Sequence, residues 1–278
     1  MNPLKYSANR LQNQDLKLFW HLIQLGFQQQ FSYRAANLAG LMTNFFFGLL
    51  RASVMIALYA ARTDVAGMSL QDAVTFTAFS QAIIAYLSLF NWWRVMLAVY
   101  SGEIASELLK PTNYFTFWLA QDIGRAIAHF LTRGLTIMAA YALFFKITVP
   151  QTVGQWLALA VTLVLSLLVS FGWRFLINLT AFWTPDARGI GRIAFGLSWF
   201  LSGFMMPLRF FPDWFVRLCH LTPFPAMVNT LLEVYLGLLE GRALLGALAQ
   251  QVLWVIALFA LCQLVMRAGV RKLVIQGG

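Results

Sequence analysis

Four side chains that could carry a charge or a proton recur at steps of three and four residues: Asp122, Arg125, His129 and Arg133. On a helix this spacing places them on one face, and Asp122 can pair directly with Arg125. A charged stripe inside a membrane is typical of an ion or proton path, but it can equally pack against a partner. The spacing leaves both interpretations open. His129 alone does not indicate a metal site, because no second ligand of the right type is nearby in the sequence.

A single arginine, Arg51, lies near the middle of a long apolar stretch. An arginine at the centre of a spanning helix costs about 2.5–3.5 kcal/mol to insert, so we expect Arg51 to face protein or water. It could line a pathway or a subunit interface, or it could be held by an internal ion pair or by snorkelling. Arg174 is a weaker case of the same kind.

Signatures of catalysis are missing from the sequence. It has no G-x-x-x-x-G-K-[ST] loop for nucleotide phosphates, no H-E-x-x-H and no G-x-S-x-G. Intramembrane proteolysis would need paired aspartates or a Ser/His pair, whereas Asp122 is the single carboxylate in the predicted spans. Cys219 and Cys262 are too few for a disulfide framework or a four-ligand zinc site. We expect no catalytic residue, cofactor or metal on this chain.

The composition identifies the solvent of the chain as the lipid bilayer. Of 278 residues, 60% are hydrophobic and 11% are charged, against about 25% charged in a soluble domain. This excludes a disordered chain and disfavours an ordinary soluble enzyme. The formal charge of +10 does not indicate nucleic-acid binding, because the basic residues mostly flank apolar runs, where they set membrane orientation.

The fold class predicted is an all-α polytopic membrane protein, with residues 1–278 forming one transmembrane domain. A helix needs about 20 apolar residues to cross the bilayer. The predicted spans are six, with the fifth short and marginal: about 37–61, 73–96, 119–145, 156–182, 193–207 and 243–266. If both termini are cytoplasmic, that side receives eleven basic residues and the other side five, which favours this orientation.

Three segments lie between or before the predicted spans. In the cytoplasmic N-terminus, 1–36, residues 16–33 are predicted to form an amphipathic helix in the membrane interface. Segment 207–242 contains four prolines and is predicted to lie outside, as two short re-entrant or interfacial helices at roughly 213–220 and 226–239.

The cytoplasmic loop 99–118 is predicted to contain a short helix, which Ser101 caps and Pro111 ends after Lys110. Its side chains divide into an apolar side and an acidic side: Ile104, Leu108 and Leu109 on one, Glu103 and Glu107 on the other. Such a helix suits a groove on another protein, although a membrane-surface helix would show the same pattern.

With these features the chain resembles the membrane subunits of type-2 ABC exporters, more narrowly the bacterial six-span permeases described as ABC-2-type permease components. The resemblance covers nearly the whole chain. Its motifs, in order after the interfacial helix, are Ser101-Gly-Glu-Ile104, Leu108-Leu-Lys-Pro111, Gly203-Phe-Met-Met-Pro207, Phe211-Pro212, Pro223-Phe224 and Tyr235-Leu-Gly237.

The resemblance implies that the loop after the second span is a coupling helix that docks on a separate ATPase subunit, which would hold ATP and Mg²⁺. The coupling residues carried over are these: Ser101, Gly102, Glu103, Ile104, Glu107, Leu108, Lys110 and Pro111. It further implies two re-entrant helices before the last span, a lipid-embedded pair of identical or paralogous permeases in the bacterial plasma membrane, and export. The permeases would meet through the first and fifth spans, where Ser198 and Ser202 form a small-xxx-small pair.

Two other functions remain open from the sequence. A stand-alone transporter or channel could use a gradient through His129 and the charged stripe. A membrane enzyme or assembly factor is the third possibility. No residue in the sequence selects a transported molecule.

Overall fold

The computed structural model describes residues 3–32, 34–90, 92–184 and 186–272. The first half of the chain forms these elements: α1 (Pro3–Gln29), α2 (Arg34–Leu58), β1 (Asp64–Val65), β2 (Met68–Ser69), α3 (Leu70–Leu87), α4 (Arg94–Ser101), α5 (Ile104–Leu108), α6 (Tyr114–His129), a π-helical turn (Phe130–Gly134) and α7 (Leu135–Phe144). The second half forms these: α8 (Val153–Leu179), a 3₁₀ turn (Thr180–Phe182), α9 (Arg188–Leu201), a 3₁₀ turn (Leu208–Phe210), α10 (Asp213–His220), α11 (Phe224–Met227), α12 (Asn229–Tyr235) and α13 (Gly241–Val270). The fold is helical apart from the β1–β2 hairpin.

Four helical segments of the described residues are long and apolar enough to cross a membrane: Arg34–Leu58, Tyr114–Phe144, Val153–Phe182 and Gly241–Val270. They correspond to the first, third, fourth and sixth predicted spans. The second and fifth correspond to α3, with 18 residues, and α9, with 14. The all-α membrane fold is therefore confirmed, whereas six spans stay a prediction.

Helix α3 lies at the centre of the bundle, packed against α2, α7 and α8. It starts with a capping box, in which Ser69 and Asp72 each accept a hydrogen bond from the other's backbone N–H. The hydroxyls of Thr75 and Thr77 donate to carbonyls four residues earlier. These internal hydrogen bonds let a helix with several polar residues stay buried along nearly its whole length.

The predicted second span, 73–96, is wrong in its last third. Helix α3 ends at Leu87, and Ser88 adopts a left-handed conformation with φ of 50°. A separate helix, α4, starts only at Arg94. The predicted span extended through this segment although Ser88, Asn91 and Arg94 interrupt its apolar run. We call residues 88–93 the α3–α4 break.

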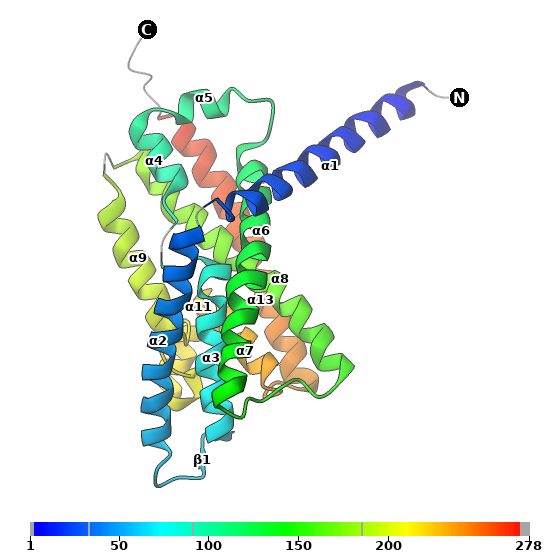
Figure 1. The fold of residues 1–278 in the computed structure, drawn as a ribbon. Helices are drawn as coiled ribbons and strands as arrows, with labels where there is room; N and C mark the ends of the chain where they lie inside the picture. Colours follow the sequence, from blue (N-terminus) through cyan, green and yellow to red (C-terminus); the bar gives the residue numbers. More distant parts are fainter. Residues whose placement is uncertain (1–2, 33, 91, 185, 273–278) are drawn as a thin grey trace.

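Helix α1 packs against α6 over its C-terminal part. A Cβ on Gly26 would overlap the backbone carbonyl of Gln121, and one on Gly124 would overlap that of Ile23. The two glycines therefore allow the backbones to touch. The predicted helix at 16–33 is real up to Gln29, while Tyr33 is outside the described residues. Leu16 and Trp20 remain 62% and 58% exposed, and Figure 1 shows α1 projecting from the bundle.

The proline-rich region forms more pieces than predicted. The first predicted helix, 213–220, is confirmed as α10. The second, 226–239, is instead two helices, α11 and α12, divided at Val228, whose φ of −125° and ψ of −63° depart from the helical values. Both pack against α8, and all four residues of α11 are buried. Whether these helices re-enter the membrane stays a prediction.

Candidate functional site

The α3–α4 break is held by side chains that satisfy its backbone carbonyls. Ser170 donates to the carbonyl of Leu87 at 2.7 Å, and the indole of Trp199 donates to that of Leu89 at 2.6 Å. Asn178 donates to the carbonyl of Trp92 at 2.6 Å, and its own oxygen accepts from the N–H of Met96 at 3.0 Å. Irregular backbone inside a membrane protein is tolerated only when its polar groups are satisfied in this way.

A buried ionic triad stands beside the break. The carboxylate of Asp122 accepts from Arg125 at 2.8 Å and from both terminal nitrogens of Arg174, at 3.0 and 2.7 Å. The side chains of Asp122 and Arg174 are each 1% exposed. Arg125 also donates to the carbonyls of Ala85 and Tyr86 at the end of α3. The predicted Asp122–Arg125 pair is confirmed, and Arg174 is a third member that the residue spacing did not predict.

The other half of the charged stripe lies apart from the triad. His129 and Arg133 line a hollow of about 250 Å³ beside the α3–α4 break. Arg133 donates to the side chain of Asn37 at 2.9 Å. Neither the Nδ1 atom of His129 nor the Nε atom of Arg133 has a partner among the described residues. The stripe thus divides into Asp122 and Arg125, which pair with each other, and His129 and Arg133, which line the hollow.

Arg51 faces protein, as its position predicts. Its guanidinium donates to the Ser80 hydroxyl at 3.1 Å and to the carbonyls of Phe204 and Met205, the latter at 2.8 Å. It also lies 5.0 Å from the ring centroid of Phe204. The contacts link α2 to α3 and to the segment after α9. The ion pairs of the described residues do not include Arg51, so an internal ion pair does not explain it.

The predicted coupling loop forms a helix–turn–helix. Ser101 is the last residue of α4 and not the cap of the next helix, because Gly102 turns the chain with φ of 80°. Glu103 takes the N-cap position of α5 without a side-chain hydrogen bond. Glu107 accepts from the Tyr114 hydroxyl at 2.8 Å, so it is engaged within the chain.

The apolar side of α5 faces inward more than predicted. Ile104 is 1% exposed, in a core cluster with Tyr114 and Trp118, and Leu108 packs against the same cluster. The residues that remain outward are Tyr100 at 66% exposure, Leu109 at 86% and the exposed Glu103. We call Tyr100, Glu103 and Leu109 the α4–α5 surface. Lys110 and Pro111 are exposed beside it.

Ser198 and Ser202 face the interior of their own chain. They are 1% and 0% exposed, and their hydroxyls donate to carbonyls within α9. The exposed side of α9 instead carries Ile193, Leu197 and Phe200. If α9 contacts a second permease, these larger residues would meet it first.

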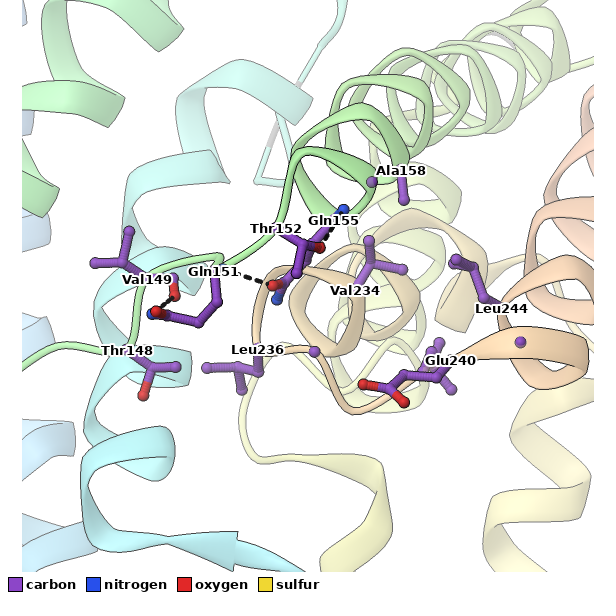
Figure 2. Close-up of a pocket in the computed structure, with 14 residues that line it drawn as sticks. Thr148, Val149, Gln151, Thr152, Gln155, Ala158, Val234, Leu236, Glu240 and Leu244 are labelled. Atoms are coloured by element: carbon purple, nitrogen blue, oxygen red, sulfur yellow. Dashed lines mark hydrogen bonds between the residues drawn. The ribbon is translucent and has the colours of Figure 1, made fainter.

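A further hollow of about 430 Å³ opens at the opposite end of the bundle from α5, between the loop before α8 and the start of α13. Figure 2 shows its polar wall, where Gln155 accepts from the Gln151 N–H at 2.8 Å. Gln155 also donates to the Tyr235 carbonyl at 3.0 Å. Of the described residues that line this hollow, Glu240 is the carboxylate.

The described part of the chain shows no cluster of side chains that could hold a metal ion. There, no three His, Cys, Asp or Glu side chains gather closely enough to hold an ion. Cys219 and Cys262 are buried free thiols.

Comparison with known protein families assigns the chain to one of them. The sequence model of a family described as "ABC-2 family transporter protein" matches residues 44–277, from the middle of α2 to beyond α13. Comparison with curated proteins gave no match. Because the matched segment covers most of the chain, the protein belongs to the ABC-2 transporter family and is a membrane-embedded permease component of an ABC transporter.

Proposed function

We propose that this chain is the permease subunit of an exporter and that separate ATPase subunits drive it by docking on the α4–α5 surface. The observation that carries the proposal is the geometry of α5. This short helix stands at one end of the bundle, with its inner side anchored in the core and Glu103 and Leu109 exposed. A small helix with an outward apolar residue beside a carboxylate suits a groove on a partner protein.

The packing provides a route from α5 into the membrane. Ile104 contacts the cluster that contains Tyr114 and Trp118 at the start of α6. Helix α4 leads back to the α3–α4 break, which Asn178 and Trp199 tie to α8 and α9. A displacement of α5 by the ATPase would therefore reach both α6 and the break without crossing a flexible linker.

We propose that two such chains, identical or paralogous, form the transporter, and that α2 and α9 meet the second copy. Both helices carry large exposed apolar residues, including Phe46, Leu50 and Val54 on α2 and Leu197 and Phe200 on α9. Lipid would cover the same faces in a monomer. A cavity between the two copies would be the path of export.

The orientation proposed is that of a bacterial plasma-membrane protein with both termini cytoplasmic. Helices α1 and α5 and the C-terminal end of α13 lie at one end of the molecule, and the β1–β2 hairpin lies at the other (Figure 1). The excess of basic residues flanking the first end supports its placement in the cytoplasm.

The docking proposal is tested by co-expressing the tagged permease with candidate ABC ATPase subunits from the same genome. We expect one of them to co-purify with the permease, and we expect Leu109→Asp and Glu103→Lys to reduce recovery of the ATPase at least tenfold. Leu221→Asp is the matched control, because Leu221 is 77% exposed in the segment after α10, at the other end of the bundle.

Full recovery of the ATPase with both α5 variants would refute docking at this surface. Loss of the ATPase with Leu221→Asp as well would show a general folding defect, and Glu103→Gln would then be the milder test. A wild-type chain that never binds the ATPase, yet conducts ions alone in vesicles, would favour a gradient-driven transporter instead.

A further inference from the structure

Two hollows lie next to each other among the long helices of the bundle. The hollow beside His129 and Arg133 measures about 250 Å³, and the one beside Arg51 about 450 Å³. Their linings share Asn44, Ile84 and Phe90, so the two hollows are adjacent. We call them together the α2–α9 groove, because α2 and α3 form one side and Trp199 of α9, with Phe204 and Met205, forms the other.

The α2–α9 groove is positively charged without compensation. Among the described residues, its lining includes Arg51, His129 and Arg133 but no aspartate or glutamate. Asp122, the carboxylate on the same helix as His129, is occupied by Arg125 and Arg174. Ionised groups inside a membrane protein are expensive unless they are paired. Two arginines facing one groove therefore favour a negative charge brought by something else.

Donors of the two arginines that line the groove remain unpaired among the described residues. A guanidinium has five N–H groups, and among the described residues Arg51 uses three of them, one toward Ser80 and two toward carbonyls. Its Nε atom and that of Arg133 are buried without a partner. Hydrogen bonds from a guanidinium to an anionic oxygen are among the strongest available in proteins.

Beside these donors the groove has an aromatic wall. The rings of Phe90 and Trp199 have centroids 4.5 Å apart, and those of Phe90 and Phe204 are 5.8 Å apart. Phe47, which is 55% exposed, completes the lining toward α2. The wall provides an apolar surface next to the cationic groups, which is the pattern that recognises a molecule with both characters.

We propose that the α2–α9 groove binds an amphipathic anion, with its acidic group at Arg51 and its apolar part against Phe47, Phe90, Trp199 and Phe204. The inference rests on the proposed function, because a transporter needs such a site for its cargo. The acidic group is a phosphate, carboxylate or sulfonate. It belongs either to a membrane lipid headgroup or to a transported amphiphile, and these share one chemistry.

The test measures binding of radiolabelled dodecyl phosphate to the purified chain in phosphatidylcholine nanodiscs, with empty discs subtracted. We expect saturable binding, competition by unlabelled dodecyl phosphate, and at least tenfold weaker competition by dodecanol and by inorganic phosphate. Equal competition by dodecanol would overturn the role of the charge. Equal competition by inorganic phosphate would overturn the role of the aromatic wall.

Variants locate the site. Arg51→Gln removes one cation, and Asn44→Asp adds a nearly isosteric carboxylate that would neutralise the groove from within. Each is expected to weaken binding at least tenfold, whereas Arg51→Lys weakens it less and Arg62→Gln, at an exposed loop residue, leaves it unchanged. Unchanged affinity in both Arg51→Gln and Asn44→Asp would refute the site. If one fails to fold, the other decides.

Two further measurements are needed. One distinguishes a lipid headgroup from a transported amphiphile, and the other distinguishes failure of the anion site from failure of the proposed function. Phosphatidylglycerol added to the discs would displace dodecyl phosphate if the occupant is a lipid headgroup, and would leave it bound if the site selects a transported amphiphile; both results support the proposal. ATPase co-purification is measured on the same preparations. Its loss with anion binding retained refutes the proposed function alone, and the reverse result refutes the anion site alone.

Discussion

Replacing Asp122 with asparagine tests whether the buried triad holds the bundle together. Asp122→Asn keeps the size of the side chain but removes the charge that both terminal nitrogens of Arg174 contact, at 3.0 and 2.7 Å. Arg174 is 1% exposed, so its charge would have no nearby anion and no water. Removing one member of a buried ion pair typically costs about 3–5 kcal/mol, and we expect a loss of unfolding free energy in this range.

Asp186→Asn is the matched control, because Asp186 also pairs with an arginine, Arg188, at 2.7 Å. Both side chains are 51% exposed there. Hydrogen bonds from Arg188 lower the pKa of Asp186 to about 2, so near neutral pH this substitution also removes a full negative charge. Solvent screens such a pair, and we expect no measurable change in stability.

Equilibrium unfolding in SDS, followed by circular dichroism in mixed micelles, measures both variants. Asp122→Asn should unfold at a clearly lower SDS fraction than the wild type, and Asp186→Asn at the same fraction. The double variant Asp122→Leu with Arg174→Met should recover part of the loss, because it removes both buried charges. The reasoning is refuted if Asp122→Asn and Asp186→Asn unfold together.

Three other contacts give predictions of their own. Gly124→Leu should separate α1 from α6, because its Cβ would meet the backbone of Ile23; trypsin should then cleave after Lys17 faster than in the wild type. Asn178→Leu should lower the unfolding free energy by at least about 2 kcal/mol in SDS titrations, since it leaves the buried carbonyl of Trp92 and an N–H in α4 unsatisfied. Cys219, which is 0% exposed, should react with maleimide only after unfolding, as mass spectrometry would show.

The overall composition predicted that the protein lies in a membrane, and the long apolar runs predicted most of the long helices. Four of the predicted spans coincide with helices that meet the length and apolarity of a membrane crossing, because an apolar run of that length has few other stable structures in a bilayer. The position of α10 was also predictable, since Pro212 precedes it and cannot continue an earlier helix.

The interruption after α3 was not predictable from local pattern. The polar residues between Leu87 and Met96 do not by themselves predict where a helix ends. The groups that bond to the end of α3 and to the break lie 39 to 110 residues away, at Arg125, Asn178 and Trp199. A retrospective signal existed in the polar residues of the third and fourth spans. Arg174, for example, has no carboxylate in its own predicted span, so it needed an anionic partner elsewhere.

The burial of Ile104 on the inner side of α5 was not predicted, for a related reason. Ile104 and Leu108 were expected on one side with Leu109, but on a short helix adjacent residues diverge by roughly 100°. The core cluster takes Ile104, and Leu109 is left outside. Sequence spacing gave the division of faces approximately but could not show which face the bundle would cover.

The arginines inside the bundle fall into two sets, those paired with a carboxylate and those that keep an unpaired donor. We expect the first set to stabilise the fold and the second set to bind the anion. Arg125 and Arg174 both pair with Asp122. Arg125 also donates to carbonyls at the end of α3, and Arg174 donates to Ser170. These two arginines therefore do not require a ligand to balance their charge. Arg51 and Arg133 keep buried Nε atoms without partners and line a groove that has no carboxylate. Neutralising the first pair should therefore lower stability before it changes binding. Neutralising the second should abolish anion binding while the bundle stays folded, because uncompensated charge in the empty groove costs stability. Finding both effects in the same pair would show that one set of charges serves both roles.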